Sequence, residues 1–124
     1  MMTEKVRLVG WIFAGVVGSG LARAFAGKSL EAPLAVVHKV VALVGVVLLF
    51  RAVGVVRVWK TAPGLPAAMV VFGVAYVAAF ASGIVQSIPA CAGTLWLSLH
   101  RMAAGVAVLA CAVAARLVAV AGRG

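Results

Sequence analysis

The stretch that decides the fold is PLAVVHKVVALVGVVLLFRAVGVV at residues 33–56, which is apolar except for three titratable or charged side chains. It exceeds the roughly 20 residues that an α-helix needs to cross the hydrocarbon core of a bilayer. Three more apolar stretches of similar length lie at about residues 6–26, 65–88 and 95–120. The sequence therefore predicts an all-α protein of the cell membrane, a four-helix bundle whose spans cross the bilayer up-down-up-down.

Composition favours one membrane domain over residues 1–124. Of these residues 66% are hydrophobic and only 10% are charged, whereas soluble domains carry roughly 25% charged residues. The chain is also short for more than one domain. No distinct processing site follows the first stretch, so we expect it to remain as a span rather than to be cleaved as a signal peptide.

The net charge of +9 comes from bases that gather near chain ends and one turn, not on a polar face. Seven of the eleven bases lie in these places: Lys5, Arg7, Arg51, Arg57, Lys60, Arg116 and Arg123. In a four-span protein all three places share one side, which the positive-inside bias makes cytoplasmic. We therefore expect both termini in the cytoplasm, contacts of the bases with anionic lipid head groups, and no nucleic-acid binding.

The first stretch carries small residues at a four-residue spacing, namely Gly10, Ala14, Gly18 and Ala22. Such a stripe lets another helix approach closely in a membrane. We therefore expect this face to contact a neighbouring helix.

The only two histidines occupy matching places in the second and fourth stretches. His38 and His100 each lie about five residues into the stretch, and a base follows each, Lys39 or Arg101. A polar ring inside a membrane is costly and needs a partner. Spans two and four run in the same direction, so both rings should lie near the outer surface. At diagonal corners of a bundle they are predicted to ligate one haem iron, most simply that of a b-type haem.

The surroundings of the histidines fit a porphyrin. Small residues below each ring, such as Gly45 and Ala104, would leave a slot for it. Bases near the outer surface would meet the haem carboxylates, because only one acid, Glu31, lies near that face. No catalytic residue is predicted. The predicted cofactor site consists of His38, His100, Arg23, Lys39, Arg101, Gly45 and Ala104, with the two histidines as iron ligands.

Other uses of these residues remain open or fit less well. A lone membrane histidine can be a hydrogen-bonded interior residue without a cofactor. Zinc fits poorly, because two imidazoles without a nearby thiolate or carboxylate fall short of its usual ligands. Cys91 and Cys111 lie on the order of 20 Å apart along the last span, so no disulfide is expected.

The second and fourth stretches share a pattern. Each has the histidine and base, then small residues, then an arginine near its far end, Arg51 or Arg116. Two related helix pairs would produce this pattern, and so would chance in a chain so rich in Ala, Val and Leu.

These motifs together resemble one half of haem A synthase, a family built from two four-helix halves, with compact one-half archaeal forms. The resemblance rests on Gly18-Ser19-Gly20, the His-base pair, Phe72-Gly73, Ser82-Gly83 and the last histidine. It implies a four-helix fold with haem ligands on the second and fourth helices, at His38 and His100.

Two departures from that family concern its chemistry. Its substrate half has a functional glutamate one turn before the first histidine, where this chain has Ala35. Its pair of outer-loop cysteines is also absent. The resemblance therefore implies the fold and the haem site better than it implies hydroxylation of a haem methyl group.

The motif His38-Lys39-x5-Gly45-x5-Arg51 is similar to small membrane cytochromes of the b561 type. Those proteins usually carry more histidines and two haems. The similarity implies a haem-binding electron carrier.

Three functions follow from these observations. The first is a one-haem membrane cytochrome that exchanges electrons with a quinol or an outer carrier, as a homo-oligomer or within a respiratory complex. The second is a haem-modifying oxidoreductase of the synthase type, and the third is a non-redox accessory subunit. One haem near the outer surface cannot carry electrons across the bilayer, because the inner half of the chain has no ligand set. That limit suits the first function.

Overall fold

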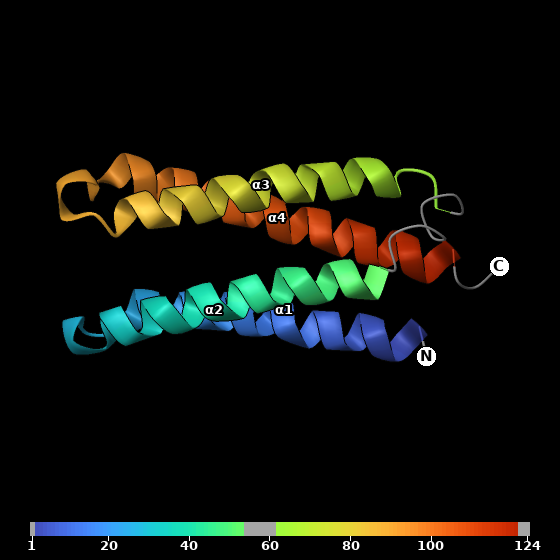
Figure 1. Cartoon of the computed structure of the whole chain (residues 1–124), viewed down its shortest axis with the longest axis horizontal. Coiled ribbons are helices and arrows are strands. Elements are labelled where there is room, and N and C mark those ends of the chain that lie inside the picture. The colour runs from blue at the N-terminus through green and yellow to red at the C-terminus, as the bar shows by residue number, and fades with distance from the viewer. Residues whose placement is uncertain (1, 54–61, 122–124) are drawn as a thin grey trace. The chain divides into compact units, whose positions relative to one another are not determined.

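The computed structural model describes residues 2–53 and 62–121, and these residues form helices joined by short connections (Figure 1). The elements are α1 (Met2–Phe25), α2 (Lys28–Val53), α3 (Leu65–Gln86), a 3-10 helix (Pro89–Cys91) and α4 (Thr94–Ala121). The described part contains no strand, so the predicted all-α class is confirmed.

Three of the helices are long and apolar enough to cross a membrane. They are the segment Ser29–Arg51 of α2, the whole of α3 and the whole of α4. In α1 the apolar part within the described residues is shorter, Gly10–Phe25. The end of the predicted second span, residues 54–56, lies outside the described residues. Helices of this length and composition are those of a membrane protein.

The chain divides into two compact units, Met1–Val58 and Trp59–Gly124. The first unit holds α1 and α2, and the second holds α3 and α4. In each unit the two helices lie side by side and run in opposite directions, so each unit is a helical hairpin (Figure 1). The single domain over residues 1–124 stays a prediction.

In the first hairpin, small residues bring α1 and α2 together. A Cβ atom added at the buried Gly45 would lie 2.8 Å from Cγ2 of Ile12 and 3.8 Å from Cγ2 of Val16. Gly15 similarly meets Val41, at 3.8 Å. Side chains of α1 therefore fill the space beside Gly45, where we predicted a slot for the porphyrin.

The predicted small-residue stripe of α1 does not face α2. A Cβ atom at Gly10 or Gly18 would have nothing within 4 Å among the described residues. Ala14 and Ala22 of the same stripe are exposed. Instead, α1 packs on α2 through Ile12, Gly15 and Val16. Contact of the stripe with a helix outside the first hairpin stays a prediction.

The second hairpin combines large side chains on α3 with small ones on α4. Its buried residues are Leu65, Met69, Phe72, Ala75, Ser82 and Gly83 on α3, and Ala107, Ala110, Cys111, Ala114 and Val118 on α4. Both sets recur every three or four residues, which places each on one face of its helix. Alanines on α4 leave room for the larger side chains of α3.

The two cysteines are both free thiols, as predicted. Cys91 is exposed in the 3-10 helix, and Cys111 is buried in α4. Neither thiol is therefore a covalent link within the second hairpin.

We predict that Gly45→Ala destabilises the protein by about 1–3 kcal/mol, because the added methyl group overpacks against Ile12. The added substitution Ile12→Ala should recover part of this loss, because it removes the contacted Cγ2. Thermal unfolding in detergent, followed by the helical circular dichroism signal, measures both effects. Gly18→Ala is the matched control and should cause no loss, because its Cβ enters open space. Equal losses for Gly45→Ala and Gly18→Ala would contradict the packing.

Candidate functional site

His38 lies on α2 opposite a serine-glycine pair on α1. Its ring nitrogen Nδ1 is 2.9 Å from Oγ of Ser19. A Cβ atom at Gly20 would lie only 3.2 Å from the ring carbon Cε1. The missing side chain of Gly20 therefore lets the imidazole lie directly against the backbone of α1.

The hydroxyl of Ser19 lies between two polar atoms. Its oxygen is 2.9 Å from the carbonyl oxygen of Val16 and 2.9 Å from Nδ1 of His38. A hydroxyl can donate one hydrogen bond and accept others, so the contact with Nδ1 forms in either tautomer of the ring. Ser19 therefore holds His38 by Nδ1.

His100 on α4 is held by α3. Its Nδ1 lies 2.7 Å from the carbonyl oxygen of Ala79. Because a carbonyl oxygen only accepts, Nδ1 of His100 carries a hydrogen and donates it. Oγ of Ser82 lies 3.5 Å from the same nitrogen. A Cβ atom at Gly83 would lie 3.2 Å from Cε1 of the ring and 3.3 Å from Nδ1.

The two hairpins therefore contain the same arrangement. In each, a Ser-Gly pair on the first helix faces a histidine on the second, and Ser19 and Ser82 precede their histidines by 19 and 18 residues. The pattern that the second and fourth stretches share is thus accompanied by similar pocket partners on α1 and α3. Both Ser-Gly pairs belong to the motifs that resemble haem A synthase, but the sequence analysis predicts no contact between them and the histidines. Their recurrence at nearly constant spacing before each histidine is the signal that could have identified these pockets.

The prediction that both histidines lie at the same depth counts residues from the start of each apolar stretch, not from the start of each helix. His38 is the eleventh residue of α2, and His100 is the seventh residue of α4. The difference comes from an extra first turn of α2, which carries Lys28, Ser29 and Glu31. This turn is polar, so the matched depth of the two rings in the apolar layer stays a prediction.

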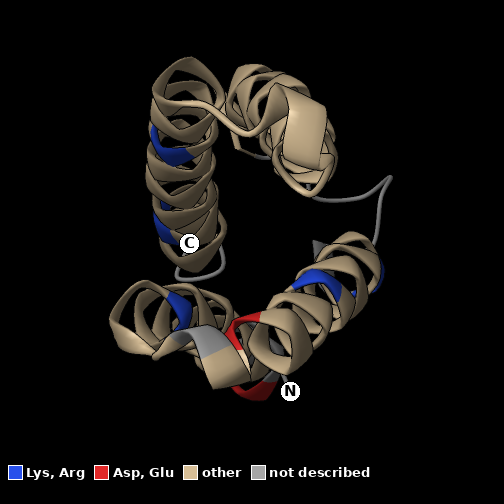
Figure 2. Ribbon diagram, turned by 90° about the vertical axis from the view of Figure 1, so that its left-hand side faces the viewer, with Lys and Arg blue, Asp and Glu red and all other residues tan. Residues whose placement is uncertain are grey.

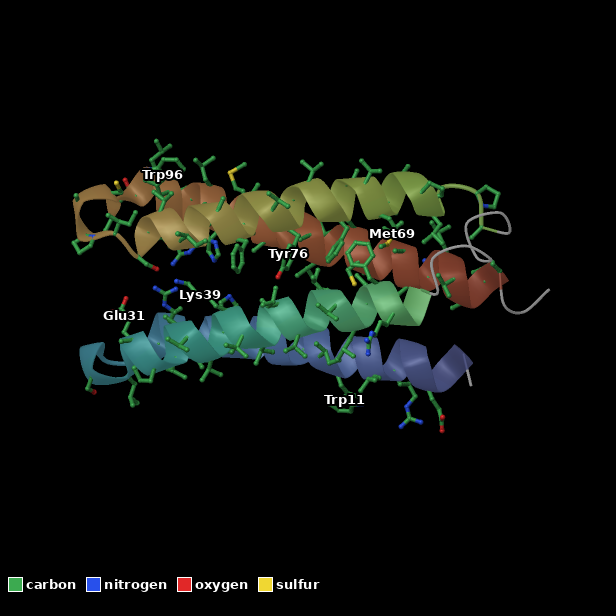
Figure 3. The ribbon with its side chains drawn as sticks, in the orientation of Figure 1. Trp11, Glu31, Lys39, Met69, Tyr76 and Trp96 are labelled. Carbon is green, nitrogen blue, oxygen red and sulfur yellow. The ribbon has the colours of Figure 1, made fainter. Side chains whose placement is uncertain are left out.

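The three predicted cofactor-binding bases have different surroundings. A guanidinium nitrogen of Arg23 lies 3.9 Å from a carboxylate oxygen of Glu31, so this base already has an acidic neighbour. Lys39 is half-buried on α2, toward the same end of the hairpin as Glu31 (Figure 3). Arg101 is exposed on α4. Lys, Arg, Asp and Glu occupy few places along the described helices (Figure 2).

The remaining predicted slot residue, Ala104, is half-buried one turn after His100. Its part in a slot for a porphyrin stays a prediction. His38 and His100 belong to different hairpins, and their use of one iron stays a prediction.

A haem iron and a bare metal ion differ in the number of ligands that they need from a protein. Within the described residues, no group of three or more His, Cys, Asp or Glu side chains could hold a metal ion. A structural zinc site needs four such ligands, and a catalytic one needs three. A haem iron receives four nitrogens from its own macrocycle and needs only axial ligands from the protein.

We predict that Gly83→Ala displaces the ring of His100, because the new Cβ would lie within 3.4 Å of two ring atoms. The Nδ1–H resonance of His100 should shift in NMR spectra of the protein in detergent, and the hydrogen bond to Ala79 should lengthen. Gly73→Ala on the same helix is the matched control, since its Cβ has nothing within 4 Å among the described residues. An unchanged His100 resonance in Gly83→Ala would refute the close contact.

No known protein family matches the chain, and no curated protein or solved structure matches it. The resemblances to haem A synthase and to b561-type cytochromes therefore stay predictions from short motifs. The two histidine pockets are the firmest guide to function.

Proposed function

We propose that the chain is a multi-pass membrane cytochrome that binds one b-type haem through Nε2 of His38 and of His100. One observation carries this proposal: both hairpins hold their histidine by Nδ1, in equivalent pockets. Metal-ligating histidines almost always donate their other ring hydrogen to a fixed acceptor, which sets the tautomer and the ring orientation. A histidine that only joins helices has no need to be held by the same ring nitrogen in both hairpins.

The donor set of the two hairpins fits a haem. Each hairpin supplies one neutral nitrogen, and a haem iron with imidazole on both faces requires two. The four α-helices would form a single up-down-up-down bundle in the membrane, with both termini in the cytoplasm and the histidines toward the outer surface. Bound haem would supply a one-electron redox centre, and the protein would supply its ligands and its apolar surroundings.

Bases beside the ligands would receive the carboxylates of the haem. Lys39 and Arg101 directly follow the two histidines, and Arg23 lies at the same end of the first hairpin as Glu31. With Lys28 the sequence places four bases and one acid, Glu31, near this side, and the two carboxylates of a haem would neutralise two of these bases. Long basic side chains can reach an interface from within a membrane helix.

Electron transfer is favoured over haem modification. A haem held by both histidines would have no open iron position at which oxygen could bind, and it would serve to pass electrons. Ala35, one turn before His38, offers no proton acceptor where the synthase family has its glutamate. The electron partners we propose are a quinol and a carrier on the outer side, with the protein acting as a homo-oligomer or a subunit of a respiratory complex.

We predict that His38→Ala and His100→Ala each abolish low-spin haem binding, because each removes one of the two axial ligands. The measurement is the reduced-minus-oxidised spectrum of protein purified in detergent after supply of haem. Met102→Leu is the control, because it changes an exposed potential ligand two residues after His100. It should retain the wild-type bands. The proposal fails if both histidine variants keep these bands, or if the wild-type protein binds no haem.

We predict that Lys39→Gln and Arg101→Gln retain low-spin haem but lower its reduction potential. A nearby positive charge stabilises the reduced state, which carries one more negative charge, so its removal favours the oxidised state. Redox titration of the visible spectrum measures the change. Arg116→Gln serves as a distant control, because Arg116 lies roughly 22 Å further along α4 at 1.5 Å per residue. Equal shifts for Arg101→Gln and Arg116→Gln would contradict a carboxylate contact at Arg101.

A further inference from the structure

We propose that Tyr76 belongs to a binding site for a quinone, and that its hydroxyl group donates a hydrogen bond to a carbonyl oxygen of the quinone. Tyr76 is the only tyrosine of the chain, and the two histidine pockets do not use it. The binding of the quinone concerns this site alone. Its use for electron exchange with a haem rests on the proposed function.

The hydroxyl group of Tyr76 is an unsatisfied polar group. Its oxygen is buried and has no hydrogen-bond partner among residues 2–53 and 62–121. A hydroxyl group in apolar surroundings without a partner loses the hydrogen bonds that it would make in water. Such groups are rare in folded proteins, so this hydroxyl calls for an acceptor.

Two aromatic neighbours hold the ring of Tyr76 in place. Its ring centroid lies 5.9 Å from that of Phe72, with 34° between the ring planes, and 6.3 Å from that of Phe80, with 15° between them. The spacing of four residues places the three rings one above another on the same face of α3. The side chain of Tyr76 extends away from the ribbon of α3 (Figure 3). Its neighbours restrict rotation of the ring, so the acceptor must come to the hydroxyl group.

The helix α3 does not supply this acceptor itself. The short hydroxyl group of Ser82 does reach its own helix, since it lies 2.7 Å from the carbonyl oxygen of Ala78 and 3.0 Å from that of Ala79. Serine side chains commonly bond to their own backbone in this way. The phenol group of Tyr76 is too long for such a bond, because its oxygen is at the far end of a rigid ring.

Other side-chain acceptors are scarce at the level of Tyr76. The chain contains no Asp and no Asn, and its only glutamine, Gln86, lies ten residues further along α3. Ten residues correspond to roughly 15 Å of helix. Both glutamates, Glu4 and Glu31, lie in the first turns of their helices. The acceptor therefore has to be a molecule that reaches the middle of the helix.

The depth of Tyr76 selects the kind of molecule. Tyr76 is the twelfth residue of α3, which has 22 residues. It lies roughly 15 Å from either end of the helix, which is half the thickness of a hydrocarbon layer of about 30 Å. Water and the ester groups of lipids are at the edges of this layer. A quinone dissolves within it, because its ring and tail are apolar, and its two carbonyl oxygens accept hydrogen bonds.

The ring of Tyr76 offers a surface for such a ligand. It is half-buried, and the neighbouring Phe80 is exposed. Flat rings pack on aromatic side chains in offset or edge-to-face arrangements. The hydroxyl oxygen itself is covered, so the quinone must displace the side chains over it as it binds.

The site lies close to the pocket of His100. The carbonyl oxygen of Ala79, three residues after Tyr76, is 2.7 Å from Nδ1 of His100. Three residues rise roughly 4.5 Å along a helix. A quinone at Tyr76 would therefore lie about one helical turn from the group that holds a proposed haem ligand, which suits the quinol that we propose as electron partner.

The first test needs neither haem nor quinone. Tyr76→Phe removes the hydroxyl oxygen and keeps the ring. Because this oxygen makes no hydrogen bond in the described chain, the variant should unfold at the same temperature as the wild type or at a higher one. Thermal unfolding in detergent, followed by circular dichroism, measures this. A lower unfolding temperature would show that the chain itself supplies an acceptor, and it would overturn the proposal.

The second test measures quinone binding to the full chain without haem. The probe is a decyl-substituted para-benzoquinone, and decylbenzene, which has the same tail but no oxygen, is the matched control ligand. We expect the quinone to bind about 2- to 10-fold more weakly to Tyr76→Phe than to the wild type, which is the effect of one neutral hydrogen bond. Decylbenzene should not distinguish the two proteins. Equal quinone affinities, or no binding to the wild type, would overturn the proposal.

Spectroscopy of the same samples identifies the bond. The infrared stretching frequency of a quinone carbonyl falls when the oxygen accepts a hydrogen bond, so it should fall with the wild type and not with Tyr76→Phe. Tyrosine labelled with carbon-13 at the ring carbon Cζ gives one NMR signal, because the chain has one tyrosine. This signal should move when the quinone is added and stay in place with decylbenzene. A signal that does not respond to the quinone would refute the contact.

The outcomes separate this site from the proposed function. A protein that binds the quinone through Tyr76 but binds no haem would refute the proposed function and leave the quinone site standing. A protein that binds haem through both histidines, but binds the quinone equally well with and without the hydroxyl group of Tyr76, would refute the quinone site alone.

Discussion

An imidazole placed in an apolar layer must have its polar nitrogens satisfied, and this constraint organises both hairpins. An unpaired polar group in such surroundings costs several kcal/mol. Each hairpin meets the cost for Nδ1 from its own first helix, through Ser19 for His38 and through the carbonyl of Ala79 for His100. The same hydrogen bond holds each ring by Nδ1, and Nε2 is the nitrogen that would bind the proposed haem. Stability and the proposed function therefore depend on the same contact.

Helix packing and hydrogen bonding support each other in this design. The imidazoles can reach their acceptors only because the next residue, Gly20 or Gly83, has no side chain. Deeper in the first hairpin, Gly45 brings α1 and α2 close enough for the contact at His38 to form. Lipid gives little hydrophobic driving force for association of helices, so close backbone approach and interhelical hydrogen bonds are the interactions that remain. Both occur at the histidines.

The helices could be predicted from the sequence, because a span long enough for a bilayer is a property of composition and length alone. The face through which each helix packs on its neighbour could not be predicted in this way. On α1, the spacing of Gly10 and Gly18 is as regular as that of the residues that actually contact α2, so the pattern does not indicate which face is used. Gly45 lacks a side chain and so leaves space, but Ile12 fills that space. The partners of the histidines were missed because a carbonyl acceptor such as that of Ala79 has no signature in sequence.

Each imidazole ring lies between a hydrogen-bonding partner and the backbone of a glycine, and this arrangement would affect the rate of electron transfer. A ring that already rests in its final orientation has few alternative rotamers to leave when it gains or loses a neighbouring charge. The nuclear rearrangement that accompanies arrival of an electron would then be small, and small rearrangement is what permits rapid exchange between centres held at a distance. The glycines beside His38 and His100, which at first concern only steric fit, would thus set the speed of the proposed carrier.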